Sequence, residues 1–183
     1  MTAYELLLIG GGAGVGKTSV AWEVSIALQE RETAHCLIEG DFMDQIHPAP
    51  DGDPYRSAIT ERNIAAVWAN YAALGQHRLI YSNTVSILEG PMISRAMGGN
   101  RGNRGNEADG VRVTHVLLTA EETTVRQRLA QREIGSQLVP HIERSLFMAR
   151  KLDDEAPPGT ARIPTDGRSV QEIAAHVVEA TAW

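Results

Sequence analysis

The sequence predicts a three-layer α/β fold, in which a five-stranded and mostly parallel sheet lies between two layers of helices. Short apolar segments alternate with amphipathic helical segments along the chain, which is the order that right-handed strand–helix–strand crossovers produce. The length of 183 residues suits one compact domain. Since the sequence contains no internal repeat, residues 1–183 are expected to form a single unit.

Five segments have the composition of strands, and these are 4–9, 35–38, 78–82, 111–118 and 161–164. The first contains an uninterrupted apolar run, Leu6-Leu7-Leu8-Ile9, which is typical of a parallel strand buried on both faces. Ligands of such folds bind outside the carboxyl ends of the strands. Residues that directly follow the expected strands are therefore the candidates for chemistry.

Helical periodicity predicts helices over 17–29, 57–74 and 141–152, a further helix that ends at Ile134, and one at the end of the chain. In the first of them Val20, Val24 and Leu28 fall on one stripe, which should face the sheet.

Two short patterns mark where helices should begin. Thr119 with Glu122, and Ser169 with Glu172, have the spacing of capping boxes. Between strands three and four, Pro91 is expected to interrupt an irregular or partly helical stretch. The glycine- and asparagine-rich residues 98–106 are expected to form a mobile loop.

A complete phosphate-binding motif follows the first expected strand. The pattern G-x-x-x-x-G-K-[ST] is filled by Gly11, Gly12, Ala13, Gly14, Val15, Gly16, Lys17 and Thr18, and Ser19 comes next. Backbone N–H groups of such a loop form a nest for phosphates, and the N-terminus of the following helix adds positive charge. Lys17 is expected to reach the β- and γ-phosphates of ATP, and the Thr18 hydroxyl to hold Mg²⁺. The motif and its strand–helix context therefore predict the P-loop NTPase fold.

Two acids follow the second expected strand. Asp41 is the preferred catalytic residue, because a carboxylate there can accept the proton of a substrate hydroxyl or help to hold Mg²⁺. Glu39 lies two residues earlier, on the same side of the extended chain, and could share that role. The alternative for Asp41 is a solvated loop acid or the cap of a short helix.

Two arginines are candidates for contacts to the transferred phosphoryl group. Arg128 and Arg132 are four residues apart and therefore share one face of the expected helix. The guanidinium group is planar and always charged, which suits phosphate oxygens. The alternative is ordinary surface charge on the helix.

The composition restricts the partners. A net charge of −6 argues against nucleic acid as the main partner. No apolar run reaches the roughly 18 residues of a membrane span, and the start of the chain does not resemble a signal peptide. The single cysteine, Cys36, lies in an apolar segment and is expected to be a buried thiol, so a reducing, cytoplasmic location is expected. The oligomeric state leaves no signal in the sequence.

With these residues in place, the chain resembles the P-loop small-molecule kinases, a group that includes gluconate, shikimate, adenylate and adenylylsulfate kinases and chloramphenicol phosphotransferases. Glu39-Gly40-Asp41-Phe42-Met43 is similar to the D-G-D-x-L segment of gluconate kinases, whose acid contacts the substrate. Arg128 to Arg132 resembles the family's R-L-x-x-R entry to the lid, which implies a short lid over 133–143 and a nucleotide contact for Arg128. Asp166 and Gly167 fall in the loop that touches adenine in the family.

The chain is also similar to tunicamycin-resistance-type ATP-binding proteins, because its third expected strand runs into polar residues without an acid. Ser82, Asn83 and Thr84 stand where the family usually has its Walker B acid. Either Asp41 serves the Mg²⁺ shell alone, through water, or Ser82 and Asn83 contribute more weakly. Two functions follow. The first is ATP- and Mg²⁺-dependent phosphoryl transfer to a small-molecule acceptor, with Lys17, Asp41, Arg128 and Arg132 as catalytic residues. The second is a nucleotide-binding protein or slow NTPase that transfers no phosphoryl group, such as a resistance or switch factor.

Overall fold

The computed structural model describes residues 4–99, 110–132 and 137–183, and within them one five-stranded sheet has the order β2-β3-β1-β4-β5. All four strand pairings are parallel, so the expected sheet is present and entirely parallel. The strands are β1 (Tyr4–Gly10), β2 (Cys36–Glu39), β3 (Arg78–Ser82), β4 (Val111–Thr119) and β5 (Ala161–Pro164). The expected strands are therefore confirmed to within one residue at each end.

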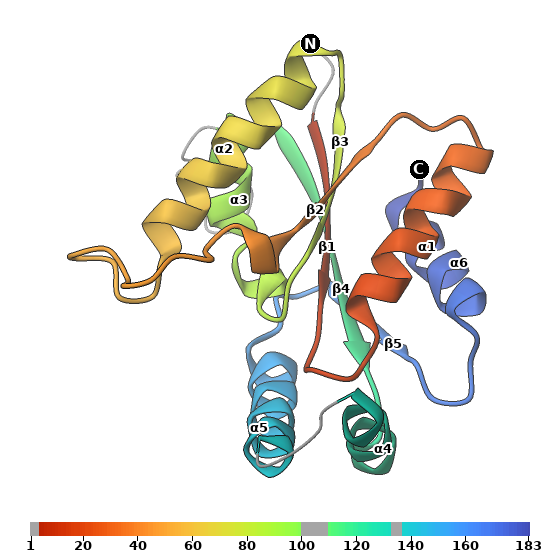
Figure 1. Cartoon of the computed structure of the whole chain (residues 1–183). Coiled ribbons are helices and arrows are strands. Elements are labelled where there is room, and N and C mark those ends of the chain that lie inside the picture. The colour runs from red at the N-terminus through yellow and green to blue at the C-terminus, as the bar shows by residue number, and fades with distance from the viewer. Residues whose placement is uncertain (1–3, 100–109, 133–136) are drawn as a thin grey trace.

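Helices cover both faces of this sheet (Figure 1). On one side lie α1 (Lys17–Glu30) and α6 (Val170–Thr181), and on the other α2 (Ser57–Ala73) and the short α3 (Gly90–Ala96). Single turns of 3₁₀ helix, η1 (Gly40–Phe42) and η2 (Ser86–Leu88), follow β2 and β3. Two further helices, α4 (Glu122–Arg132) and α5 (Leu138–Glu155), lie beyond the end of the sheet at which β4 terminates (Figure 1).

Each face of the sheet has its own apolar core because successive side chains of a strand point to opposite faces. Leu7 and Ile9 of β1 pack with Val20, Val24 and Leu28 of α1, all nearly inaccessible to solvent. Alternate β1 residues face the other core, which also contains side chains of α2 and α3. The expected stripe of α1 is therefore confirmed, and each such buried side chain contributes about 1.5–3 kcal/mol relative to an exposed one.

Two local expectations need correction. Thr119 is the last residue of β4, and α4 begins only at Glu122, so Thr119 cannot act as the helix cap. Pro91 lies in the first turn of α3, where its missing N–H costs nothing, so it begins a helix instead of interrupting one. The capping box of Ser169 with Glu172 at the start of α6 is confirmed.

The helix expected over 141–152 is longer, because α5 runs from Leu138 to Glu155. Parts of three expected features, the end of the helix at Ile134, the loop 98–106 and the lid 133–143, lie outside the described residues.

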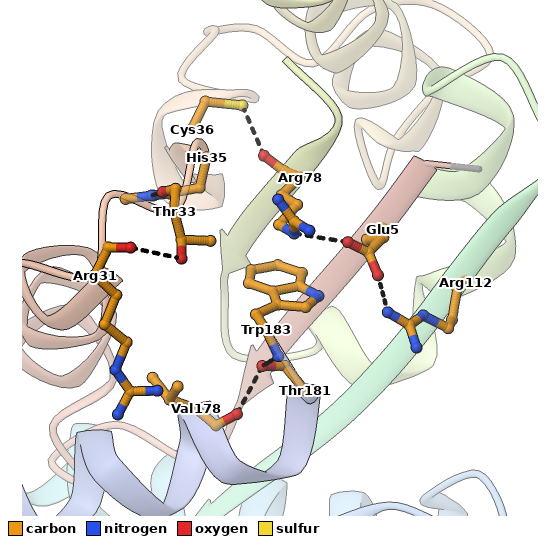
Figure 2. Close-up of polar contacts among 10 residues, drawn as sticks. All are labelled: Glu5, Arg31, Thr33, His35, Cys36, Arg78, Arg112, Val178, Thr181 and Trp183. Carbon is orange, nitrogen blue, oxygen red and sulfur yellow. Dashed lines mark hydrogen bonds and ion pairs between the residues drawn. The ribbon is translucent and has the colours of Figure 1, made fainter. Parts of the chain in front are cut away.

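Figure 2 shows the amino-terminal end of the sheet, where Glu5 of β1 lies between Arg78 of β3 and Arg112 of β4. Arg78 Nε is 2.7 Å from one carboxylate oxygen, and Arg112 forms an ion pair with the other. Trp183, near the end of α6, covers Arg78 with its ring centroid 5.9 Å from the guanidinium carbon. These contacts close the end of the sheet that lies opposite the phosphate-binding loop.

Cys36 is a free and buried thiol, as expected. Burial raises the pKa of this thiol to about 12, so it remains protonated at neutral pH. Among the helices of the described ranges, none has the length and apolarity needed to cross a lipid bilayer.

Candidate functional site

The phosphate-binding loop connects β1 to α1 and has the backbone conformation that its glycines permit. Gly14 and Gly16 have φ angles of +83° and +95°, which residues with a side chain adopt only with strain. Gly16 is the N-cap of α1 and supplies no side chain to the first turn. The N–H groups at the start of α1 therefore lack a side-chain acceptor, as an anion-binding helix N-terminus requires.

Lys17 lies inside this loop. Its Nζ donates a hydrogen bond to the Gly12 carbonyl at 3.0 Å, which folds the side chain back across the loop. Burial lowers the pKa of Lys17, while the carboxylates of Asp41 and Glu39 act in the opposite direction. The ammonium group thus lies between the loop and two acids, Glu39 at the end of β2 and Asp41 just beyond it.

Glu39 lies beside Thr18. The Thr18 hydroxyl donates to Glu39 Oε2 at 3.4 Å, while Glu39 Oε1 is buried and has no hydrogen-bond partner among the described residues. Burial, and then the charge of Asp41, raise the pKa of Glu39. A hydroxyl and a carboxylate with an unsatisfied buried oxygen are the hard oxygen donors that Mg²⁺ prefers, so these residues fit the metal that the motif implies.

The sheet register explains how an acid can be present although β3 ends without one. Glu39 is the last residue of β2, and it pairs directly with Ser82, the last residue of β3. The carboxylate therefore lies one strand away from the expected position but at the same level of the sheet. The sequence analysis gave Glu39 only a secondary role. The feature that could have identified it is its position at the carboxyl end of β2.

Asp41 lies in η1, just beyond Glu39, and a hydrogen bond from a neighbouring side chain fixes the orientation of its carboxylate. Asn83 Nδ2 donates to Asp41 Oδ1 at 3.2 Å, and Asn83 Oδ1 in turn accepts from the Val85 N–H at 3.1 Å. The Gln45 side chain donates to the Asp41 carbonyl at 2.6 Å. Asn83 therefore positions Asp41, a role that sequence reasoning missed because the two residues are 42 positions apart.

These groups line one pocket of about 280 Å³. Lys17, Thr18, Glu39 and Asp41 share it with Arg132, so the structure brings together most of the residues predicted for catalysis and metal binding. The remaining lining residues are Ala13, Gly14, Gly16, Ser19, Ser82, Asn83, Thr84 and His141.

Arg128 does not line that pocket but braces the back of the loop. Its Nη1 donates to the Thr165 hydroxyl at 2.9 Å, and its Nη2 to the Thr165 carbonyl at 3.1 Å. Nη1 also lies within 3.3–3.4 Å of the carbonyls of Gly14 and Val15. A phosphoryl contact for Arg128 therefore stays a prediction, and the bonds present here tie the loop to the end of β5.

A second brace comes from α5, where the buried Ser145 donates to the Ala13 carbonyl at 2.7 Å. A Cβ atom at Gly12 would lie only 3.0 Å from the Ser145 carbonyl oxygen. The loop is thus packed directly against α5. No local pattern marked Ser145, because its partner is 132 positions away in the chain.

Asp166 and Gly167 lie in the loop between β5 and α6. The Asp166 carboxylate accepts the Glu121 N–H at 3.1–3.2 Å, so it caps the start of α4 in place of Thr119. Hydrogen bonds, first from the Thr124 side chain and then from the Glu121 backbone, lower the pKa of Asp166. The adenine contact expected for Asp166 and Gly167 stays a prediction.

Comparison with solved structures identifies the fold. A gluconokinase from Sinorhizobium meliloti aligns with a TM-score of 0.59 and 16% identity over 100% of this chain and 94% of that one. The tunicamycin resistance protein of Deinococcus radiodurans aligns with a TM-score of 0.59 and 16% identity over 98% of this chain and 96% of that one. An APS kinase from Mycobacterium tuberculosis, in complex with AMPPNP and APS, aligns with a TM-score of 0.58 and 16% identity over 100% of both chains.

At sequence level no family model and no curated protein matches the chain. The three structures have P-loop small-molecule kinase-like folds, and this chain has the same fold. The expected P-loop α/β architecture is therefore confirmed. At 16% identity the likeness extends to the fold and not to a particular activity.

Proposed function

We propose that the protein is an ATP-dependent phosphotransferase that acts on a hydroxyl group of a small molecule. The observation that carries this proposal is the position of Asp41. It lies in the same pocket as the phosphate-binding loop, and Asn83 holds one of its carboxylate oxygens. A carboxylate held in this way beside the phosphate site is suited to accept the proton of an acceptor hydroxyl.

The residues of the pocket have separate tasks in this proposal. The loop N–H groups and Lys17 bind the phosphates of ATP, which supplies the phosphoryl group when bound. Thr18 and Glu39 hold Mg²⁺, whose charge neutralises phosphate oxygens. This assignment moves the main metal acid from Asp41 to Glu39, because Glu39 lies against the Thr18 hydroxyl.

Asp41 accepts the proton of the acceptor hydroxyl. Since Asn83 occupies Oδ1, the second oxygen, Oδ2, faces the acceptor in this proposal. Arg132, which lines the pocket, supplies positive charge near the transferred group. Such a transfer depends mainly on positioning and electrostatics, so these few groups are sufficient.

The test is the Asp41→Asn variant. We measure ADP release from Mg·ATP with pools of hydroxylated compounds, and the affinity for a fluorescent ATP analogue separately. Acceptor-dependent release should fall by about 10²–10⁴-fold, the usual contribution of a general base, while nucleotide affinity stays within about twofold. Asp51→Asn is the matched control, because Asp51 is an exposed acid in the turn before α2.

A second function has one observation in its favour, namely that β3 ends in Ser82 instead of an acid. A nucleotide-binding protein or slow NTPase would bind ATP and show the same background hydrolysis with every acceptor pool. If the wild-type protein behaves in this way, or if Asp41→Asn leaves acceptor-dependent release unchanged, phosphoryl transfer through Asp41 is wrong.

A further inference from the structure

A buried tyrosine lies directly under η1, the turn that carries Asp41. Tyr81 of β3 is fully inaccessible, yet its hydroxyl has no hydrogen-bond partner among the described residues. The hydroxyl lies so close to Gly40 that a Cβ atom there would be 2.4 Å from Tyr81 Oη. A buried hydroxyl without a partner is costly, and one next to the candidate active site indicates a group that arrives with a ligand.

Three carboxylates lie near enough to this hydroxyl for their charges to shift its pKa. Burial, and then the charges of Glu89, Asp44 and Asp41, raise the pKa of Tyr81 above its ordinary value. Glu89 stands at the start of α3, and its Oε2 is buried without a hydrogen-bond partner among the described residues. Burial and the charge of Asp44 raise the pKa of Glu89 as well. The cluster of Asp41, Asp44, Tyr81 and Glu89 is called the acidic subsite below.

Positive side chains do not balance this charge from the same part of the chain. Residues 40–99 are all described, and they contain no lysine and four arginines. Each of these arginines already forms an ion pair or a hydrogen bond elsewhere. Arg95 pairs with Glu61 at 2.8 Å, and Arg78 pairs with Glu5 at the opposite end of β3. The other two donate to main-chain carbonyls, Arg56 to that of Ile46 and Arg62 to that of Ala58.

We infer that the acidic subsite binds an ammonium group of the acceptor, which makes the acceptor a hydroxylated amine such as an amino alcohol or an amino sugar. The inference rests on the proposed phosphotransferase function and names its substrate class. An ammonium group offers three N–H donors, which match Tyr81 Oη and the buried oxygen of Glu89, and its charge offsets the carboxylates. A carboxylate or phosphate on the acceptor would meet like charges instead.

The arrangement also separates the region that would bind the phosphates of ATP from the region that would bind the amine of the acceptor. The phosphate side holds Lys17 and Arg132, whereas the acidic subsite contains only acids and a tyrosine. Asp41 belongs to both regions, since it lines the pocket and its charge is one of those that raise the pKa of Tyr81. The acceptor hydroxyl would therefore meet Asp41, with the amine farther toward α3.

The test compares acceptors that differ in charge but share one skeleton. Glucosamine, glucose and glucuronate form one set, and serinol, glycerol and glycerate form another, supplemented by pools of larger hydroxylated amines, polyols and hydroxy acids. We measure ADP release from Mg·ATP and, separately, the rise in melting temperature that each compound produces with a non-hydrolysable ATP analogue. The amines should give the highest kcat/KM and the largest thermal shift.

Glu89→Gln is the diagnostic variant, because it keeps the shape of the side chain and removes its charge. It should lower kcat/KM for amines about tenfold or more, the cost of losing a charge-assisted hydrogen bond, and leave ATP affinity unchanged. Tyr81→Phe should raise KM for amines several-fold and still fold, since it removes a hydroxyl without a partner. Glu155→Gln, at the exposed end of α5, is the matched control.

The outcomes separate this inference from the function on which it rests. Preference for hydroxy acids or neutral polyols, or an unchanged preference in Glu89→Gln, overturns the amine subsite while a kinase remains. Thermal stabilisation by amines without any ADP release supports the subsite and contradicts phosphoryl transfer. Neither release nor stabilisation in any class, with ATP binding intact, contradicts both.

Discussion

Arg128 offers a direct comparison between a role inferred from sequence and the bonds observed. If it contacts the transferred phosphoryl group, Arg128→Ala should abolish transfer and leave stability unchanged. The structure supports bracing instead, because two short hydrogen bonds of 2.9 and 3.1 Å join the guanidinium to Thr165. We therefore expect Arg128→Ala to destabilise the protein and weaken nucleotide binding.

The magnitude follows from the environment of Thr165. This residue is 0% exposed, so its hydroxyl and carbonyl would lose their partner without gaining free access to water. A hydrogen bond from a charged donor contributes about 1.5–3 kcal/mol, and Arg128 is itself only half-buried, so we take the lower part of that range for the pair. The expected loss is about 1.5–2 kcal/mol in the free energy of unfolding. A domain of this size should then melt about 3–8 °C lower.

Urea unfolding, followed by circular dichroism, measures the stability, and titration with a fluorescent ATP analogue measures the affinity, which should fall about tenfold as the loop loses its brace. The control is Arg126→Ala on the same helix. Among the described residues Arg126 pairs with Glu122 alone, on the exposed face, so its loss should cost at most about 0.5 kcal/mol. Wild-type stability and affinity in Arg128→Ala would refute the bracing role, and loss of transfer alone would favour the phosphoryl contact.

Three further predictions concern stability. Gly40→Ala places a Cβ atom 2.4 Å from Tyr81 Oη and should cost about 1–3 kcal/mol; part of this should be recovered in the Tyr81→Phe background, and full additivity in urea unfolding would contradict the clash. Glu39→Gln should stabilise the ligand-free protein at neutral pH but weaken Mg²⁺-dependent ATP binding. Folding raises the pKa of Glu39, so the folded wild-type protein favours the protonated carboxyl group. Its free energy of unfolding should therefore fall as pH rises above about 4.3, and wild type and Glu39→Gln should have similar stabilities below that pH. A difference in stability that is the same at every pH would refute the assignment. Glu5→Gln leaves Arg78 and Arg112 on either side of β1 without the carboxylate between them, and should lower the free energy of unfolding by about 1–3 kcal/mol. An unchanged melting temperature would show that the two ion pairs contribute no net stability.

The order of elements was readable from the sequence because each depends on local chemistry. The apolar run Leu6 to Ile9 can only be a buried strand in this context, and the spacing of apolar residues in α1 matches one face of a helix. The phosphate-binding loop is equally local, since its conformation follows from glycines within eight residues. These patterns sufficed for the α/β class and for the positions of Lys17 and Thr18.

The end of β4 and the start of α4 show why local patterns can fail. Thr119 and Glu122 have the spacing of a capping box, but pairing with β5 keeps Thr119 in the strand. The cap comes from Asp166, which accepts the Glu121 N–H and lies 45 residues after Glu121 in the chain. A side chain that arrives through tertiary packing can replace the cap that the sequence indicates, because the helix N–H groups can donate to any suitably placed carboxylate.

The sequence by itself determined the parallel α/β fold and the phosphate-binding loop, because both rest on periodicity and on residues close together in the chain. Only the tertiary structure decided which side chains share the site. The register of β2 with β3 places Glu39 beside Ser82, and packing turns Arg128 away from the pocket. Packing also buries the Tyr81 hydroxyl close to Gly40, without a hydrogen-bond partner among the described residues. These contacts join residues tens of positions apart, and their geometry depends on how the sheet and its helices pack together.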